Sequence, residues 1–164
     1  MVDLRLGHRE PALTGRNTMT AYFDTSATVK LYLVEPDSIM VEQVYGASRQ
    51  VFSHEIAYVE VRAALAIARR MQRLDEMQHH ELVADFMSDW RKDFSQVSTD
   101  EALLERAAEL AEGFGLRGYD AMHLASADRL RSQLPALVFV SFDRALNRAA
   151  KLIGLSLPDF TPIA

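Results

Sequence analysis

Two pairs of acidic residues stand where their side chains could meet in one cleft. Asp24 ends a short apolar strand that begins at Thr20, and Asp143 follows another strand. Ligands bind at such strand ends in open α/β sheets. Glu60 and Asp120 lie on predicted helices that pack against the same sheet. Carboxylates gathered in one place repel one another, and a divalent cation relieves the repulsion.

Carboxylate oxygens are hard ligands, which favour Mg²⁺ or Mn²⁺ over zinc. A cation held there can activate a water molecule and stabilise the charge that builds on a phosphate. The acids therefore predict metal-assisted hydrolysis of a phosphodiester bond, without a covalent enzyme intermediate. We expect Asp24, Asp120 and Asp143 to hold metal directly or through water. Glu60 is expected to be a further ligand or to orient the attacking water.

Three of these acids also have an ordinary structural interpretation. Asp24 and Asp143 each precede a predicted helix, where Asp is a common N-cap. Asp120 lies in the first turn of its helix, where the helix dipole favours a carboxylate. Taken one at a time, these residues leave both interpretations open.

Glu60 gives a separate reason to expect a cation. It shares helical spacing with Ile56, Ala63 and Ile67, which predicts that it lies on the apolar stripe of its helix. A carboxylate on such a stripe needs compensation by a metal ion, a proton or a buried Arg. Arg62 is only two residues away and points elsewhere on a helix.

The elements that must position these acids alternate between short apolar strands and amphipathic helices. Such alternation predicts right-handed crossovers and a parallel sheet with helices on both faces. Besides the strand that ends at Asp24, strands are expected at 51–53, 94–97, 136–141 and 155–157. Helices are expected at 26–34, 36–47, 54–73, 75–92, from a capping box at 98–101 to about 113, at 119–134 and at 144–153.

The bulk properties suit one globular domain. The chain has 164 residues, a formal net charge of −5 and no cysteine. Residues 1–18 lack periodicity, and we expect them to be a loosely held extension, or Met19 to be the natural start, with the domain at 19–164. No apolar run approaches the length of a membrane span, and the lack of cysteine fits a reducing compartment, so a cytoplasmic protein with no membrane contact is expected.

Four segments together resemble PIN-domain ribonucleases, most closely the VapC-type toxins of bacterial toxin–antitoxin pairs. The segments are Tyr22–Ala27, Ser53 with Glu60, Leu116–Ala125 and Val140–Leu146. They occur in the family's order and on the expected elements, and the resemblance spans residues 19 to about 157. The family's acidic set corresponds to Asp24, Glu60, Asp120 and Asp143 without a substitution.

The resemblance implies a three-layer α/β/α sandwich and endonucleolytic cleavage of RNA with Mg²⁺ or Mn²⁺. It also implies a cognate antitoxin protein as inhibitor, and suggests a homodimer. Ser141 stands where the family often has a hydroxyl residue that supports the acids. Thr25 and Ser26 are expected to play a similar supporting part.

Basic residues near the predicted site could contact RNA. Arg144 and Arg148 share a helix face beyond Asp143, and Arg117 stands three residues before Asp120. A solvated face, or an ion pair in the case of Arg117, explains them as well. His123 lies one helical turn after Asp120, and the sequence favours a packing role for it over a general acid.

Two further apolar stripes admit two explanations. Leu82, Phe86 and Trp90 form one, and Ile56, Val59 and Ala63 form the other. Either stripe could be a dimer face or an antitoxin groove, and core packing explains much of the same pattern.

The residues argue less well for three other functions. A catalytically silent PIN-like module that binds RNA or protein is the main alternative, and the complete acidic set argues against it. A phosphatase of the haloacid-dehalogenase type would need a second Asp where Ser26 stands. A phospho-acceptor domain would need its Asp on a middle strand and a late Lys.

Overall fold

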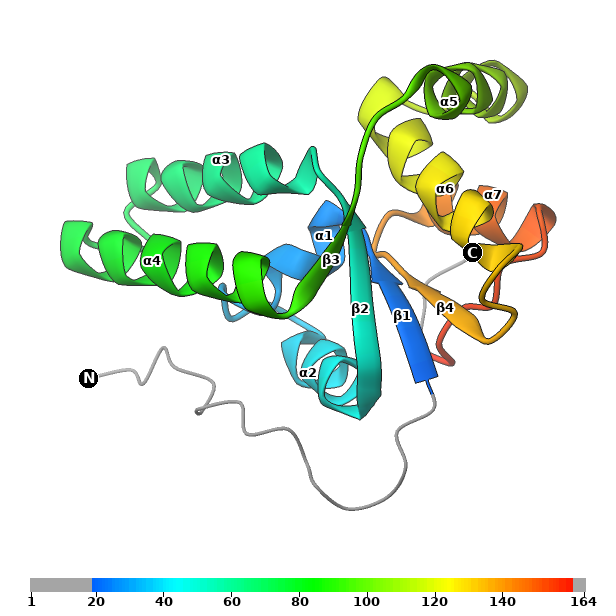
Figure 1. Ribbon diagram of the computed structural model, residues 1–164. Helices are drawn as coiled ribbons and strands as arrows, with labels where there is room; N and C mark the ends of the chain where they lie inside the picture. The colour runs from blue at the N-terminus through cyan, green and yellow to red at the C-terminus, as the bar shows by residue number, and fades with distance from the viewer. Residues whose placement is uncertain (1–18, 161–164) are drawn as a thin grey trace.

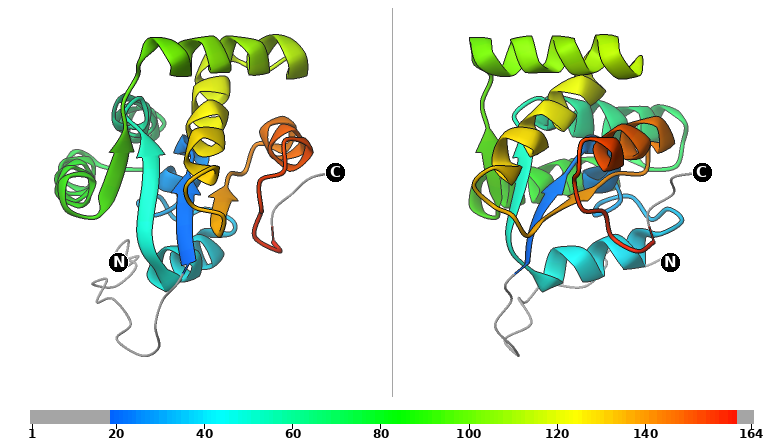
Figure 2. Two further views of the ribbon diagram at one scale, coloured as in Figure 1. Left: turned by 45° about the vertical axis from the view of Figure 1, so that its right-hand side comes forward. Right: turned by 90° about the vertical axis from the view of Figure 1, so that its right-hand side faces the viewer.

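The computed structural model describes residues 19–160, which form a parallel sheet between two layers of helices (Figure 1, Figure 2). The strands are β1 (Met19–Phe23), β2 (Ser48–His54), β3 (Phe94–Val97) and β4 (Leu137–Val140). Their order in the sheet is β3-β2-β1-β4, and every pairing is parallel. The predicted three-layer α/β/α sandwich is confirmed, while the prediction for residues 1–18 lies outside the described residues.

Strands β1 and β4 are buried on both faces because their side chains alternate between two hydrophobic cores. In β1, Ala21 and Phe23 belong to one core, and Tyr22 between them belongs to the other. In β4, Phe139 and Val140 divide in the same way. This is the burial expected of apolar strands in a parallel sheet.

The first face of the sheet is covered by α1 (Thr25–Val29), α2 (Ser38–Ala47), α3 (Ala57–Arg70) and α4 (Glu76–Lys92). On α4, Leu82, Phe86 and Trp90 are buried in this core, and Trp90 stacks on Phe94 of β3. That stripe is therefore core, and the alternative that it forms a docking surface is wrong.

The second face is covered by α5 (Glu101–Phe114), α6 (Gly118–Arg131) and α7 (Arg144–Leu152). Helix α5 packs on α6, and ion pairs join the two, one between Arg106 and Asp128 and one between Arg129 and Asp100. None of the helices in the described part of the chain is long and apolar enough to cross a membrane.

Several predicted element ends were wrong. Strand β2 continues through His54, so α3 begins at Ala57 rather than at residue 54. Helix α1 ends at Val29 rather than at residue 34, and α2 begins at Ser38 rather than at residue 36. The edge strand expected at 155–157 is a single bridge between Val138 and Ser156.

The N-cap of α5 was also predicted wrongly. Asp100 is the cap, and its carboxylate accepts a hydrogen bond from the Leu103 backbone N–H at 2.8 Å. The Thr99 hydroxyl, inside the expected capping box, instead donates to Glu55. The helix ends at Gly115, whose φ of 65° is the left-handed conformation that glycine adopts without strain.

Candidate active site

The site lies at the carboxyl ends of β1 and β4, where the strand order reverses. The chain leaves β1 toward β2 on one side, while β4 pairs with β1 on the other. The backbone N–H of Asp24 donates to the carbonyl of Val140 at 3.1 Å, which extends the ladder by one residue. Asp24 and Ser141 are thereby brought to the same edge, the switch point where open α/β sheets bind ligands.

Asp24 serves as a helix cap and as a wall of the pocket at once. Its Oδ1 accepts from the Ala27 backbone N–H at 2.9 Å and from the Ser26 hydroxyl at 2.7 Å. Its Oδ2 accepts from the Ser141 hydroxyl at 2.6 Å. The side chain is buried, and burial raises the pKa of Asp24 although these hydrogen bonds favour its charged form. The N-cap interpretation of Asp24 is therefore confirmed, and its role as a metal ligand stays a prediction.

The loop after β4 is fastened to the same carboxylate. Ser26 accepts a hydrogen bond from the Phe142 backbone N–H at 2.8 Å, and Ser141 accepts one from the Asp143 N–H at 3.1 Å. Asp143 caps α7, because its Oδ1 accepts from the Leu146 N–H at 2.8 Å. Ser26 and Ser141 therefore link Asp24 to the segment that carries Asp143.

Asp120 lies in the first turn of α6 and is half-buried. Its pKa is raised, first by burial and then by the negative charges of Asp143 and Asp24. Burial raises the pKa of Asp24 as well, but for Asp120 neighbouring negative charges act in the same direction as burial. The raised pKa of Asp120 therefore reports directly that negative charges are close together in this pocket.

Glu60 reaches the pocket, but the predicted reason was wrong. The buried face of α3 consists of Ala57, Val61, Leu65 and Ala68. The stripe that was expected to be buried faces solvent, with Val59 62% exposed and Ile67 45% exposed. Two apolar series run along this helix, and the one with smaller side chains packs inward. Glu60 lies at the border of the buried face, in the first turn.

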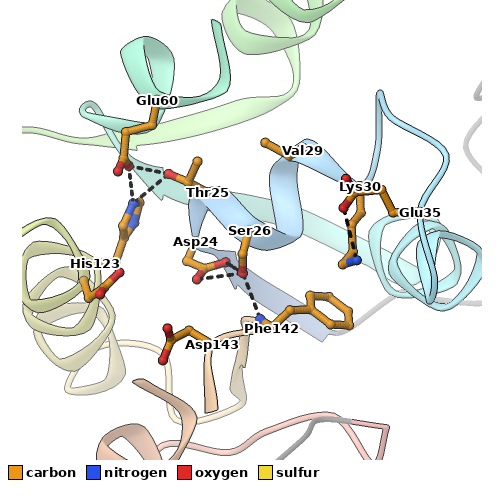
Figure 3. Close-up of a pocket in the computed structure, with 11 residues that line it drawn as sticks. Asp24, Thr25, Ser26, Val29, Lys30, Glu35, Glu60, His123, Phe142 and Asp143 are labelled. Atoms are coloured by element: carbon orange, nitrogen blue, oxygen red, sulfur yellow. Dashed lines mark hydrogen bonds and ion pairs between the residues drawn. The ribbon is translucent and has the colours of Figure 1, made fainter. Parts of the chain in front are cut away.

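Thr25 and His123 hold the Glu60 side chain. Thr25 Oγ1 donates to Glu60 Oε2, and His123 Nε2 lies 3.1 Å from the same oxygen. Burial acts to raise the pKa of Glu60, but these hydrogen bonds outweigh it and keep that pKa below its usual value. Figure 3 shows Glu60, Thr25 and His123 joined at one side of the pocket.

The pocket wall also contains residues that the sequence did not place there, among them His123 and Lys30. His123 was assigned a packing role, yet its ring faces Glu60 and Thr25. Lys30 lies at the opposite side of the pocket, bonded to the Pro36 carbonyl at 2.8 Å and placed 4.6 Å above the Phe142 ring (Figure 3). The rings of Tyr22 and His54 that pack on His123, and the Phe142 ring below Lys30, are distant in sequence, so no local pattern predicts either position.

All four predicted acids line one pocket of about 380 Å³, together with Thr25, Ser26 and His123. Within residues 19–160, no three acidic or histidine side chains are grouped as the ready-made cage of one ion. Mg²⁺ rarely needs such a cage, because it usually keeps several waters and takes one or two carboxylates plus substrate phosphates. The crowded carboxylates around Asp120 suit that mode of binding.

The basic residues predicted to contact substrate are not part of this wall. Arg117 precedes α6, and Arg144 and Arg148 lie on α7, all with exposed side chains. None of the three lines the pocket. That these three residues contact RNA on the surface around the pocket stays a prediction.

Comparison with known proteins gives a consistent result. Residues 21–152 match the model of the PIN domain family. The chain is 39% identical over 137 residues to ribonuclease VapC45 of Mycobacterium tuberculosis strain CDC 1551 / Oshkosh and to ribonuclease VapC49 of strain ATCC 25618 / H37Rv. Each of those alignments covers 81% of this chain and 90% of the relative. Ribonuclease VapC46 of the second strain is 31% identical over 140 residues, 83% of this chain and 94% of its own length.

Proposed function

Because the chain belongs to the PIN-domain family, and within it to the VapC-type ribonucleases, we propose that it is a toxin endoribonuclease that uses Mg²⁺ or Mn²⁺. One observation carries the metal-dependent part of this proposal. Asp24, Asp120 and Asp143 line one pocket, and two of these charges raise the pKa of the third. Cleavage of RNA by hydrolysis fits such a pocket, because a carboxylate-held cation offsets the charge of a phosphate.

Each acid has a proposed role. Asp24, Asp120 and Asp143 would hold the ion directly or through water, and the ion when bound would polarise water and neutralise charge on the scissile phosphate. Glu60 lines the same pocket, held by Thr25 and His123, and orients the attacking water or accepts its proton. Ser26 and Ser141 keep the Asp24 carboxylate in one orientation.

The partners follow from the same family. We propose RNA as the substrate, with Arg117, Arg144 and Arg148 near its backbone, and a cognate antitoxin protein as the inhibitor. A homodimer is proposed as well, from the resemblance alone. A toxin that cleaves the RNA of its own cell is expected to act in the cytoplasm.

An RNA cleavage assay tests the metal-carboxylate mechanism. The purified protein is incubated with structured RNA and Mg²⁺ or Mn²⁺, with EDTA, and as the Asp120→Asn variant. Asp120 is a cleaner probe than Asp24, whose carboxylate also caps α1. We expect EDTA to abolish cleavage and the substitution to lower kcat about 100-fold or more, since it removes charge that stabilises the transition state.

The matched control is Glu112→Gln, which removes one exposed charge on α5, outside the pocket. It is expected to keep wild-type activity. Cleavage that survives EDTA, or Asp120→Asn, contradicts the mechanism. Absence of cleavage by the wild type, with no growth arrest on expression, favours the silent RNA- or protein-binding module.

A further inference from the structure

A buried chain of hydrogen bonds runs from the centre of the sheet to Glu60. The hydroxyl of Tyr22 lies 2.9 Å from His123 Nδ1. On the other side of the ring, Nε2 lies 3.1 Å from Glu60 Oε2 and 3.1 Å from Thr25 Oγ1. Tyr22 and His123 are both buried, whereas Glu60 reaches the pocket.

Donors and acceptors fix the direction of this chain. Ionised Glu60 can only accept, and Thr25 Oγ1 already donates its proton to Glu60. Nε2 must therefore carry the proton that faces these two oxygens. In a neutral ring the lone pair is then on Nδ1, and the Tyr22 hydroxyl donates to it. A tyrosine hydroxyl keeps its proton at neutral pH, and that of Tyr22 is buried against the ring.

The surroundings hold the ring in one place. Tyr22 stacks on Phe139 of β4, with ring centroids 5.6 Å apart. The His123 ring packs edge-on against Tyr22 and against His54, the last residue of β2. Rings from three neighbouring strands thus support an imidazole on α6, and they hold it from the side of the sheet.

We propose that Tyr22 and His123 are positioning residues, which fix the Glu60 carboxylate and the Thr25 hydroxyl at the pocket wall. The proposal rests on the proposed ribonuclease function, because it assigns Glu60 a task in the reaction. Neither residue contacts the substrate in this scheme. Tyr22 selects the Nε2–H tautomer, and His123 delivers that N–H to Glu60. Such supporting hydrogen bonds are worth about 10- to 100-fold in activity.

The kinetic test compares Tyr22→Phe with Tyr32→Phe. Both remove the hydroxyl of a buried tyrosine, but that of Tyr32 is bonded to Asp89 on α4 at 2.9 Å, away from the pocket. We expect Tyr22→Phe to lower kcat about 10-fold with little change in KM, and Tyr32→Phe to leave both unchanged. Equal kcat values in the two variants overturn the proposal.

Substitutions of His123 separate positioning from packing. We expect His123→Ala to lower kcat about 10- to 100-fold. His123→Gln, which keeps an N–H donor near the place of Nε2, is expected to recover part of that loss. If His123→Gln and His123→Ala lose the same activity at similar thermal stability, the ring acts by packing and the proposal fails.

Nitrogen NMR of the histidine side chains gives a readout that needs no activity. His123, assigned by the loss of its signals in His123→Gln, is expected to carry its proton on Nε2 in the wild type. In Tyr22→Phe we expect a mixture of tautomers. A wild-type proton on Nδ1, alone or beside one on Nε2, overturns the hydrogen-bond direction. If the wild type cleaves no RNA, the proposed function fails, while this measurement still decides the tautomer.

Discussion

Asp120 is held in a place where its charge is unfavourable. Its pKa is raised by burial and by Asp143 and Asp24, so the folded state binds its proton more tightly than the unfolded chain does. The folded state then carries more protons between the two pKa values, and stability falls as pH rises through that range. We predict that Asp120→Asn melts at a higher temperature than the wild type at neutral pH in EDTA.

Thermal melts across pH check this prediction. The advantage of Asp120→Asn is expected to shrink as pH falls below the ordinary range of an aspartate, because both proteins are then neutral at this position. Glu112→Gln, the exposed control on α5, should show no such trend. A variant that is less stable than the wild type at neutral pH would show that Asp120 makes a favourable contact instead.

Ser141 offers a second prediction, because it donates to a buried carboxylate. Ser141→Ala removes the 2.6 Å bond to Asp24 and the acceptor for the Asp143 N–H. We expect a loss of about 1–3 kcal/mol in the free energy of unfolding, measured by urea denaturation, together with reduced RNA cleavage. Ser132→Ala, which removes an exposed hydroxyl bonded to a backbone carbonyl, is the control and should keep full activity.

At this scale the sequence identified the acids better than it explained them. Asp24 and Asp143 follow apolar strands, and that position alone predicted that their side chains lie close together. Glu60 was chosen for a stripe that turned out to face solvent, so the residue reached the pocket for another reason. His123 was missed because its partner Tyr22 lies 101 residues away, and only the folded sheet brings them together.

Among the elements, α4 has the most complete N-terminus. Asp75 accepts from the Gln78 backbone N–H at 2.8 Å, and the Gln78 side chain accepts from the Asp75 N–H at 2.9 Å. We predict that Asp75→Ala lowers the free energy of unfolding by about 1 kcal/mol, the usual worth of an N-cap. RNA cleavage should be unchanged, because Asp75 does not line the pocket. If Asp75→Ala lost RNA cleavage while keeping wild-type stability, the assignment of Asp75 to a purely structural role would be contradicted.

The elements themselves were largely predictable, and their ends were not. The apolar runs of β1 and β4 and the periodicity of α4 were sufficient to place these elements. Helix α3 shows the limit, since Ile67 and Met71 are apolar and exposed while Leu65 and Ala68 are buried. Periodicity predicts that a helix has an apolar face, but packing against α1 and α4 selects which series becomes that face.

For the whole molecule, metal binding is expected to raise the stability of the folded state. An ion that binds only the folded state stabilises it by RT ln(1 + [L]/Kd). We predict that Mg²⁺ or Mn²⁺ raises the melting temperature of the wild type with increasing concentration, and raises that of Asp120→Asn less. The melting temperature of Asp120→Asn should therefore be the higher one in EDTA, and the difference should disappear as metal is added. Equal shifts in both proteins would show that the ion binds elsewhere.

The hydrogen bond from the Asp24 N–H to the Val140 carbonyl has a consequence for how this protein tolerates changes of length. Successive residues of a strand point to opposite faces, so one residue added to or deleted from β1 or β4 turns every later side chain of that strand over. Ser141 would then face away from Asp24, and the pocket would lose its register while the helices remained intact. The turn between α3 and α4, outside both the sheet and the pocket, is the safer place for an insertion.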